Sequence, residues 1–183
     1  MPRLKSVKWC PIGLLILANM WLTSPAHAQK ALSDFKNYEP INEQLHTCGR
    51  VKETDLASLK AAGINVVISL STDSPSEIKA MKLSANEQGM TLVHIPVSWK
   101  APSIASLETF FEAMDQYQSS HLLVHCRINW RASAFVYLYR TIRLKEVPAE
   151  AKEPLLAVWN PWKNKTWAGF MLKANLHFAT KKQ

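Results

Sequence analysis

Three short apolar runs, separated by segments of helical character, constrain the fold of this chain most strongly. Residues 65–70, 91–97 and 122–125 are rich in Val, Ile and Leu, which is typical of strands buried on both faces. Between the second and third runs, apolar residues recur at helical spacing (Leu107, Phe110, Phe111 and Met114). This alternation predicts an α/β fold of three layers, in which helices cover a mostly parallel sheet.

Turn and capping residues place the other elements around these strands. Pro96 is expected near the end of its strand or at a sheet edge, and residues 30–42 form a polar segment before the first helix. In the helix that begins at Ser76, Ile78, Met81 and Leu83 are expected to supply apolar contacts. The remaining helices are expected at residues 55–62, 132–144, 149–158 and 167–178.

The first 28 residues have the pattern of a secretory signal peptide. Basic residues at positions 3, 5 and 8 precede an apolar run from Ile12 to Leu22, and Ala26-His27-Ala28 forms a small-x-small cleavage site. We therefore expect an exported, periplasmic protein whose residues 29–183 form a single domain. No later segment has the length of apolar sequence that a bilayer requires, so no stable membrane anchor is expected after cleavage.

Charge and composition narrow the classes of partner. The whole chain carries a formal net charge of +8. The mature part, without the three basic residues of the signal, carries +5. This balance suits an anionic substrate, but basic runs interleaved with aromatic residues are absent, so no nucleic-acid partner is expected. The histidines and cysteines lack metal-ligand spacing, and we expect neither a metal nor another cofactor.

Only Cys48 and Cys126 remain after signal cleavage. An oxidising compartment permits a disulfide between them, but sequence separation does not fix the spatial distance that a bridge requires. Cys48 has three interpretations: a small core residue, half of a disulfide, or a resolving thiol for Cys126.

The segment from Val124 to Ser133, VHCRINWRAS, has the residues of an anion-binding loop with a cysteine nucleophile. Cys126 follows a strand and precedes a helix, at the carboxyl edge where such sheets bind ligands. The helix dipole and backbone N–H groups stabilise a thiolate and a tetrahedral oxyanion there. Arg131 adds a two-pronged donor that matches phosphate geometry. Attack by Cys126 on a phosphate monoester would give a phosphocysteine that water hydrolyses.

The other residues of this loop have supporting roles in the prediction. His125 is expected to tune the thiolate, and Ser133 to donate a hydrogen bond to the departing sulfur. Because the loop lacks glycine, Asn129 is the best candidate for a positive φ angle. The anion is expected to contact residues that flank Cys126: His125, Arg127, Ile128, Asn129 and Trp130.

Several segments resemble the bacterial relatives of dual-specificity and tyrosine phosphatases that have a shortened active-site loop. The quoted stretches are HCRINWRAS, LASLKAAGINVVISL, LVHIPVSW and the Trp159-Asn160-Pro161 segment, and together they span most of the mature chain. The resemblance implies the fold of the cysteine-dependent phosphatases. It also implies Cys126 as the nucleophile and Arg131 as the phosphate clamp.

The chain departs from that family at three points. Four residues separate Cys126 from Arg131 instead of five, a spacing that rhodanese-type sulfurtransferases use. Phosphatases place an Asp general acid after the strand at residues 92–97, where this chain has no acid before Glu108. Asp73, after the preceding strand, is the nearest alternative donor. Finally, Ala132 stands where phosphatases usually place Ser or Thr.

Three functions from different classes therefore remain. The first is an exported phosphatase-like hydrolase that acts on a small-molecule or protein phosphate ester. The second is a sulfurtransferase that carries a persulfide on Cys126. The third is a non-catalytic module that binds anions or phosphorylated ligands.

Overall fold

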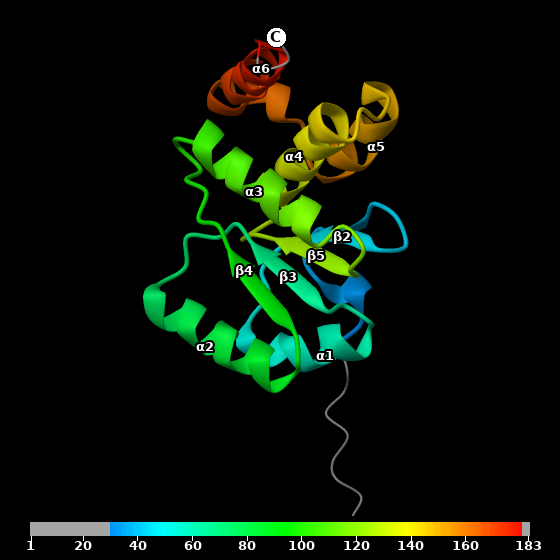
Figure 1. Cartoon of the computed structure of the whole chain (residues 1–183), viewed down its shortest axis with the longest axis vertical. Coiled ribbons are helices and arrows are strands. Elements are labelled where there is room, and N and C mark those ends of the chain that lie inside the picture. Colours follow the sequence, from blue (N-terminus) through cyan, green and yellow to red (C-terminus); the bar gives the residue numbers. More distant parts are fainter. Residues whose placement is uncertain (1–29, 181–183) are drawn as a thin grey trace, which may run out of the picture.

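The computed structural model describes residues 30–180, and these form an α/β domain around a five-stranded sheet (Figure 1). The predicted signal peptide at residues 1–28 lies outside the described residues. The strand order is β1-β2-β5-β3-β4, with all neighbours parallel except the β1–β2 pair. The strands are β1 (Glu39–Pro40), β2 (Leu45–Cys48), β3 (Val66–Ser69), β4 (Thr91–His94) and β5 (Leu122–His125).

Helices cover both faces of this sheet, which confirms the predicted three-layer α/β fold. α1 and α2 lie below the sheet in Figure 1, and α3 to α6 lie above it. The α-helices are α1 (Leu56–Ala61), α2 (Pro75–Glu87), α3 (Ile104–Gln116), α4 (Trp130–Leu138), α5 (Pro148–Val158) and α6 (Lys165–Thr180). Short helices of other types occupy Leu32–Asp34 (η1), Glu53–Asp55 (η2), Tyr139–Arg143 (η3, a π-helix) and Pro161–Lys163 (η4).

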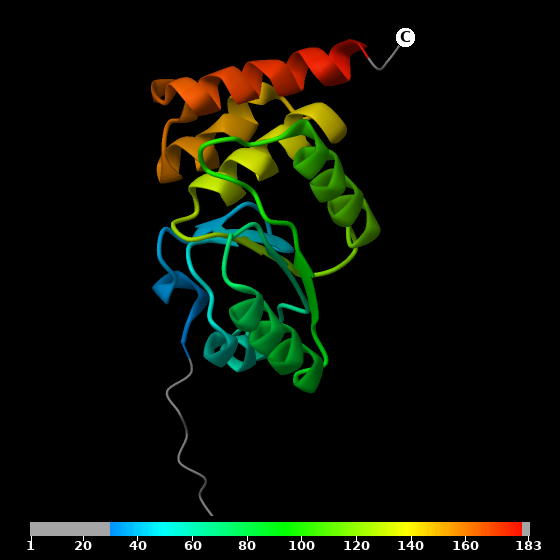
Figure 2. The ribbon, with the colours of Figure 1, turned by 90° about the vertical axis from the view of Figure 1, so that its left-hand side faces the viewer.

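The alternation of side chains along the strands divides the core into two parts. Val66 and Ile68 of β3 face the larger part, under α3 to α6, whereas Val67 faces the smaller part on α1 and α2. The central β5 is buried along its whole length because it contributes to both parts. The carboxyl ends of the parallel strands lie on the left in Figure 1 and toward the viewer in Figure 2.

Some predicted elements differ from those in the structure. The strand predicted at residues 91–97 ends at His94, and the helix predicted at residues 132–144 is divided into α4 and the π-helix η3. Strand β2 (Leu45–Cys48) was not expected, yet it pairs with the central strand β5. Its four residues include His46 and Thr47, so its sequence lacks the continuous apolar run that identified the other buried strands. Leu83 of α2 was expected to contact the core but is 54% exposed, whereas Ile78 and Met81 are buried as expected.

The chain from β4 to α3 is attached to the C-terminal helices by a tryptophan cluster. The Trp99 ring lies 5.4 Å from the rings of both Trp130 and Trp159 and 5.2 Å from that of Trp167, measured between centroids. The Trp167 indole N–H donates to the Trp99 carbonyl at 3.1 Å. Aromatic pairs of this geometry add to the free energy of burial, so the cluster holds this connection beside the start of α4.

No helix among residues 30–180 is long and apolar enough to cross a membrane.

Trp167→Ala is expected to lower the free energy of unfolding by about 3–5 kcal/mol, because it empties a fully buried site and removes the Trp99 hydrogen bond. Leu172→Ala on the same helix, at a position 62% exposed, should change it by less than about 0.5 kcal/mol. Urea denaturation of both variants measures the difference. Equal losses would contradict the assigned role of the cluster.

Candidate active site

The loop after β5 connects the centre of the sheet to α4. Cys126 directly follows the strand and Asn129 is the N-cap of α4, so the nucleophile candidate lies within one turn of a helix N-terminus. Cys126 is almost fully buried. This is the position at a carboxyl edge where helix dipole and backbone N–H groups favour an anion.

Asn129 supplies the backbone turn that the loop needs. Its φ angle of 67° lies in the left-handed region, as expected from the absence of glycine. The side chain is turned away from the loop opening, since its Nδ2 donates to the Asn37 carbonyl at 2.6 Å and the Thr47 hydroxyl at 2.9 Å. Asn129 is expected from the sequence to contact the substrate, but its side chain instead fixes the shape of the loop.

A second contact fixes the other side of the loop. Ile128 forms an isolated antiparallel bridge with Gly49, and the Asn37 amide donates to the Ile128 carbonyl at 2.9 Å. A Cβ atom on Gly49 would lie 2.8 Å from the Lys36 carbonyl oxygen, which is closer than van der Waals contact allows. The absence of a side chain at Gly49 thus lets the chain around Lys36 pack directly against the segment that bridges the loop.

Arg131 is a buried cation in the first turn of α4. It is 7% exposed, and its Nη1 donates to the carbonyls of Leu70 and Val97 at 3.0 and 2.8 Å. Among residues 30–180, no carboxylate forms an ion pair with it. Because burying an uncompensated charge is costly, the guanidinium makes this place strongly favourable for an anion.

A pocket of about 330 Å³ brings these groups together. Two residues that sequence reasoning missed, Thr72 and Trp99, contribute to its wall. Thr72 follows β3 at the same carboxyl edge. Ligands bind at the carboxyl ends of parallel strands, so the rule that predicts a site at Cys126 also applies to Thr72. The lining residues are Thr72, Trp99, Cys126, Arg127, Ile128, Trp130 and Arg131. Five of them lie in the loop and at the start of the helix where the sequence predicts the site.

The Ser133 hydroxyl is engaged by the backbone of the loop and the first turn of α4. It donates to the Asn129 carbonyl at 2.8 Å and approaches the Trp130 carbonyl at 3.3 Å. A hydroxyl bonded to the preceding helical turn is a common alternative to an outward hydrogen bond. In this structure Ser133 therefore supports the loop backbone, which corrects its expected role.

Asp73 also has a different role from the expected proton donor. It accepts hydrogen bonds from Ser71 and from Arg50, whose Nη2 lies 2.6 Å away, and it does not line the Cys126 pocket. Burial acts to raise the pKa of Asp73, but these hydrogen bonds and the Arg50 charge outweigh burial and lower it. The ionised carboxylate is thereby favoured, which is the wrong form for a general acid.

His125 belongs to a polar row on the α1–α2 side of the sheet. It is in register with Cys48 on one neighbouring strand and with Ser69 on the other, and Ser69 is in register with His94. Neither ring nitrogen of His125 makes a hydrogen bond of normal geometry to a described residue. Burial is the largest cause that lowers the pKa of His125, to about 4, and the charges of His94 and Arg131 act in the same direction. The Asp73 charge and the nearby Cys126 backbone act in the opposite direction. His125 is therefore neutral near pH 7 and lies beneath the loop, outside the pocket lining.

Cys48 and Cys126 are free thiols on opposite sides of the sheet. Cys48 packs in the smaller part of the core and Cys126 in the larger part, although the Cys126 N–H donates to the Cys48 carbonyl at 3.3 Å. Burial, reinforced by the nearby Cys126, raises the pKa of the Cys48 thiol. Of the three interpretations of Cys48, the structure fits the buried core residue.

Within residues 30–180, no group of three or more His, Cys, Asp or Glu side chains is arranged to hold a metal ion.

The buried His125 predicts a stability that depends on pH. Its pKa is lower in the folded state than the ordinary 6.5, so the unfolded chain binds more protons between pH 6.5 and about pH 4. The free energy of unfolding should therefore fall by about 2.5 kcal/mol as the pH decreases through this range. In His125→Gln this loss should be smaller by that amount. Urea denaturation across the range measures both slopes, and identical slopes would contradict the prediction.

Comparisons with known proteins agree with this geometry. Residues 24–161 match the family model described as a DSP-PTPase phosphatase fused to NAD+ kinase. A DUF442 protein from Shewanella putrefaciens CN-32, described as a candidate phosphatase, is 32% identical with a TM-score of 0.68; the match covers 80% of this chain and 96% of that one. No curated protein matches the chain.

More distant solved structures share the fold. PTPMT1 is 15% identical with a TM-score of 0.58, over 78% of this chain and 99% of that one. Pseudomonas aeruginosa TpbA is 16% identical with a TM-score of 0.61, over 85% and 98%. A second structure of TpbA, with a cysteine replaced by serine, is a complex with phosphotyrosine.

Proposed function

Because the chain belongs to the family of DSP-PTPase phosphatases described as fused to NAD+ kinase, we propose that it hydrolyses phosphate monoesters through a phosphocysteine on Cys126. The observation that carries this proposal is the buried Arg131, which has no carboxylate partner among the described residues and lies in the same pocket as Cys126. A dianionic phosphate compensates that charge, and the guanidinium fork matches its oxygens.

The proposed reaction has two steps. In the first, the Cys126 thiolate forms a bond to phosphorus while the ester P–O bond breaks, and the leaving oxygen takes the bonding electrons. In the second, water attacks the phosphorus, the S–P bond breaks and the sulfur regains its electron pair as inorganic phosphate departs. Arg131 and the N-terminal N–H groups of α4 stabilise the charge on the equatorial oxygens in both steps.

The lining of the pocket favours esters with good leaving groups. Within residues 30–180 no carboxylate lines it, and Trp99 lies in the connection where phosphatases carry their acid. Without a general acid, the leaving oxygen departs unprotonated, which costs roughly 10²–10⁴ in rate for a poor leaving group. Aryl phosphates, including phosphotyrosine of the kind bound by TpbA, are therefore the proposed substrates. Trp99 and Trp130 offer an aromatic wall for the aryl ring.

The test is turnover of p-nitrophenyl phosphate by the mature protein under reducing conditions, with an alkyl phosphate for comparison. Cys126→Ser should abolish the activity. Arg131→Lys should lower kcat/KM by at least about 10²-fold, because a lysine does not reproduce the bidentate contact. Arg143→Lys, an exposed position that pairs with Asp115, is the matched control and should be neutral. The alkyl phosphate should be turned over at least about 10²-fold more slowly.

Two results would replace this proposal. Transfer of sulfur from thiosulfate to cyanide that depends on Cys126, without phosphate release, would identify a sulfurtransferase. Binding of phosphate by both the native protein and Cys126→Ser, with no turnover of either substrate, would identify a non-catalytic module.

Export remains a proposal that rests on the N-terminal sequence, with its basic start, its apolar run from Ile12 to Leu22 and its Ala26-His27-Ala28 site. Mass measurement of the protein recovered from the periplasm should give Gln29 as the first residue. Recovery of an uncleaved chain would contradict the proposed leader.

A further inference from the structure

A second depression lies beside the Cys126 pocket, between α2 and strand β4. This α2–β4 groove has a volume of about 500 Å³. Its lining residues are Asp73, Pro75, Ile78, Lys79, Lys82, Leu83, Asn86 and His94. None of them takes part in the reaction proposed above.

The groove and the Cys126 pocket are lined by neighbouring residues of one loop. Thr72 lines the Cys126 pocket and its neighbour Asp73 lines the groove, both in the chain that leaves β3 at the carboxyl edge. A phosphorylated residue that reaches Cys126 would therefore carry its flanking chain toward α2.

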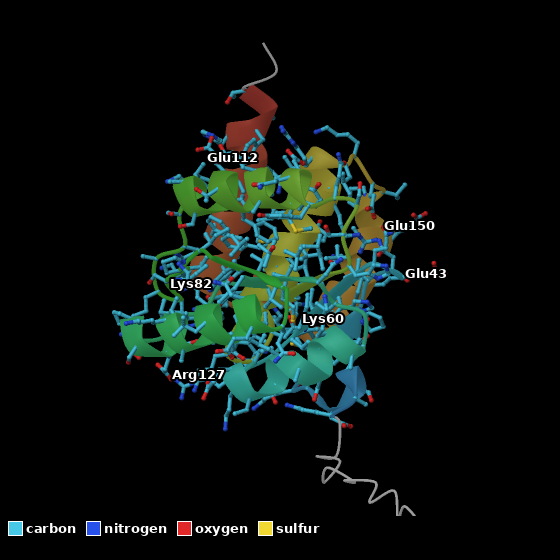
Figure 3. All side chains as sticks on the ribbon, turned by 60° about the horizontal axis from the view of Figure 1, so that its bottom comes forward. Glu43, Lys60, Lys82, Glu112, Arg127 and Glu150 are labelled. Atoms are coloured by element: carbon cyan, nitrogen blue, oxygen red, sulfur yellow. The ribbon has the colours of Figure 1, made fainter. Side chains whose placement is uncertain are left out.

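The charge of the α2–β4 groove is positive. Lys79 and Lys82 are exposed and three positions apart on α2, so they lie on the same face of the helix. The acid in the lining, Asp73, is already compensated by Arg50 at 2.6 Å. Figure 3 shows Lys82 and Arg127 on the left of the view and Glu43 and Glu150 on the opposite side. Acidic side chains are the complement of this surface.

The outer backbone of β4 offers a second kind of contact. β4 is the last strand of the sheet and is only partly buried. The N–H groups of Thr91 and Ile95 donate to the carbonyls of Asn65 and Ser69 in and before β3, at 2.9 Å each. Along a strand, successive residues direct their N–H and C=O groups to opposite sides. Those of Leu92 and His94 therefore point away from β3. Such an edge accepts an extended peptide by main-chain hydrogen bonds. The exposed Leu83 adds an apolar contact.

The length of the groove distinguishes a peptide from a small anion. The lining runs along α2 from Pro75 to Asn86, which corresponds to about 16 Å at the rise of an α-helix. An extended chain covers that distance with about five residues. A single additional phosphate would occupy only one end of it.

We propose that the α2–β4 groove binds an extended, acidic segment that adjoins the phosphorylated residue of a protein substrate. Lys79 and Lys82 pair with its carboxylates, and the outer edge of β4 pairs with its backbone. This inference rests on the proposed phosphatase function, because it assigns the substrate class of that same site.

Charge reversal on α2 tests the proposal. The substrates are p-nitrophenyl phosphate, a phosphotyrosine peptide with acidic flanks, and the same peptide with its acids replaced by the corresponding amides. Lys79→Glu/Lys82→Glu should lower kcat/KM for the acidic peptide about ten-fold and leave p-nitrophenyl phosphate within about two-fold. The preference of the native protein for the acidic peptide should shrink as salt is added.

Lys165→Glu/Lys173→Glu is the matched control, since it makes the same change of charge at exposed positions of α6, on the opposite side of the sheet from α2 (Figure 1). It should leave both peptides unaffected. An equal loss in the control, or an unchanged ratio of peptide to p-nitrophenyl phosphate turnover in the α2 variant, would overturn the groove proposal while leaving the phosphatase proposal intact.

A binding measurement tests the groove proposal separately from the phosphatase proposal, even if no turnover is found. In the Cys126→Ser background, fluorescence anisotropy of the labelled acidic phosphopeptide needs no catalysis. The α2 substitutions should weaken its binding about ten-fold, and the amide peptide should bind weakly to both proteins. Equal binding of the acidic peptide with and without the α2 substitutions would refute the groove.

Discussion

The guanidinium of Arg131 is buried between the ends of two strands, and the rest of the site depends on that placement. Its Nη1 is held by the carbonyls of Leu70, just after β3, and Val97, beyond β4. Those bonds satisfy one nitrogen and fix the plane of the group, but they do not neutralise its charge. An isolated cation in this setting is tolerable only beside an anion. A phosphate group held in the pocket would be such an anion, which is why the proposed substrate is a phosphate ester.

The short loop is stable because distant segments hold it. Asn129 takes the left-handed conformation, and its side-chain amide donates to the Asn37 carbonyl and the Thr47 hydroxyl. Gly49 forms a bridge with Ile128 and leaves room for Lys36 on its other side. On the other side, the tryptophan cluster holds Trp99 against the beginning of α4. The loop is therefore prearranged by contacts outside it, as a site that binds charge in a transition state requires.

The parts of this structure that sequence reasoning predicted are those specified by local pattern. Strands β3 and β5 are continuous apolar runs, and the positive φ of Asn129 follows from the absence of glycine in the loop. Strand β2 was not predicted because it has only four residues, two of them polar, and so shows no clear hydrophobic periodicity. Its burial comes from pairing with β5, more than 70 positions away.

The errors at the site have the same origin. Asp73 was nominated by its position after a strand, but Arg50, 23 positions earlier in the chain, makes it an ion-pair partner. Ser133 is expected from the sequence to donate to the departing sulfur, whereas its hydroxyl donates to the Asn129 carbonyl at the N-cap of α4. Trp99 joined the pocket through contacts with three other tryptophans. Sequence spacing locates an element, but the partners that orient a side chain are set by the tertiary structure.

In the proposed reaction, Cys126 carries the phosphoryl group during turnover. Rapid acid quenching of the reaction with an aryl phosphate, followed by mass spectrometry of the peptide that contains Cys126, tests it most directly. The peptide should gain the mass of one phosphoryl group on Cys126, and the same peptide from Cys126→Ser should gain none. Turnover that persists in Cys126→Ser, or a sulfur increment on Cys126 in place of the phosphoryl group, would contradict the proposed reaction.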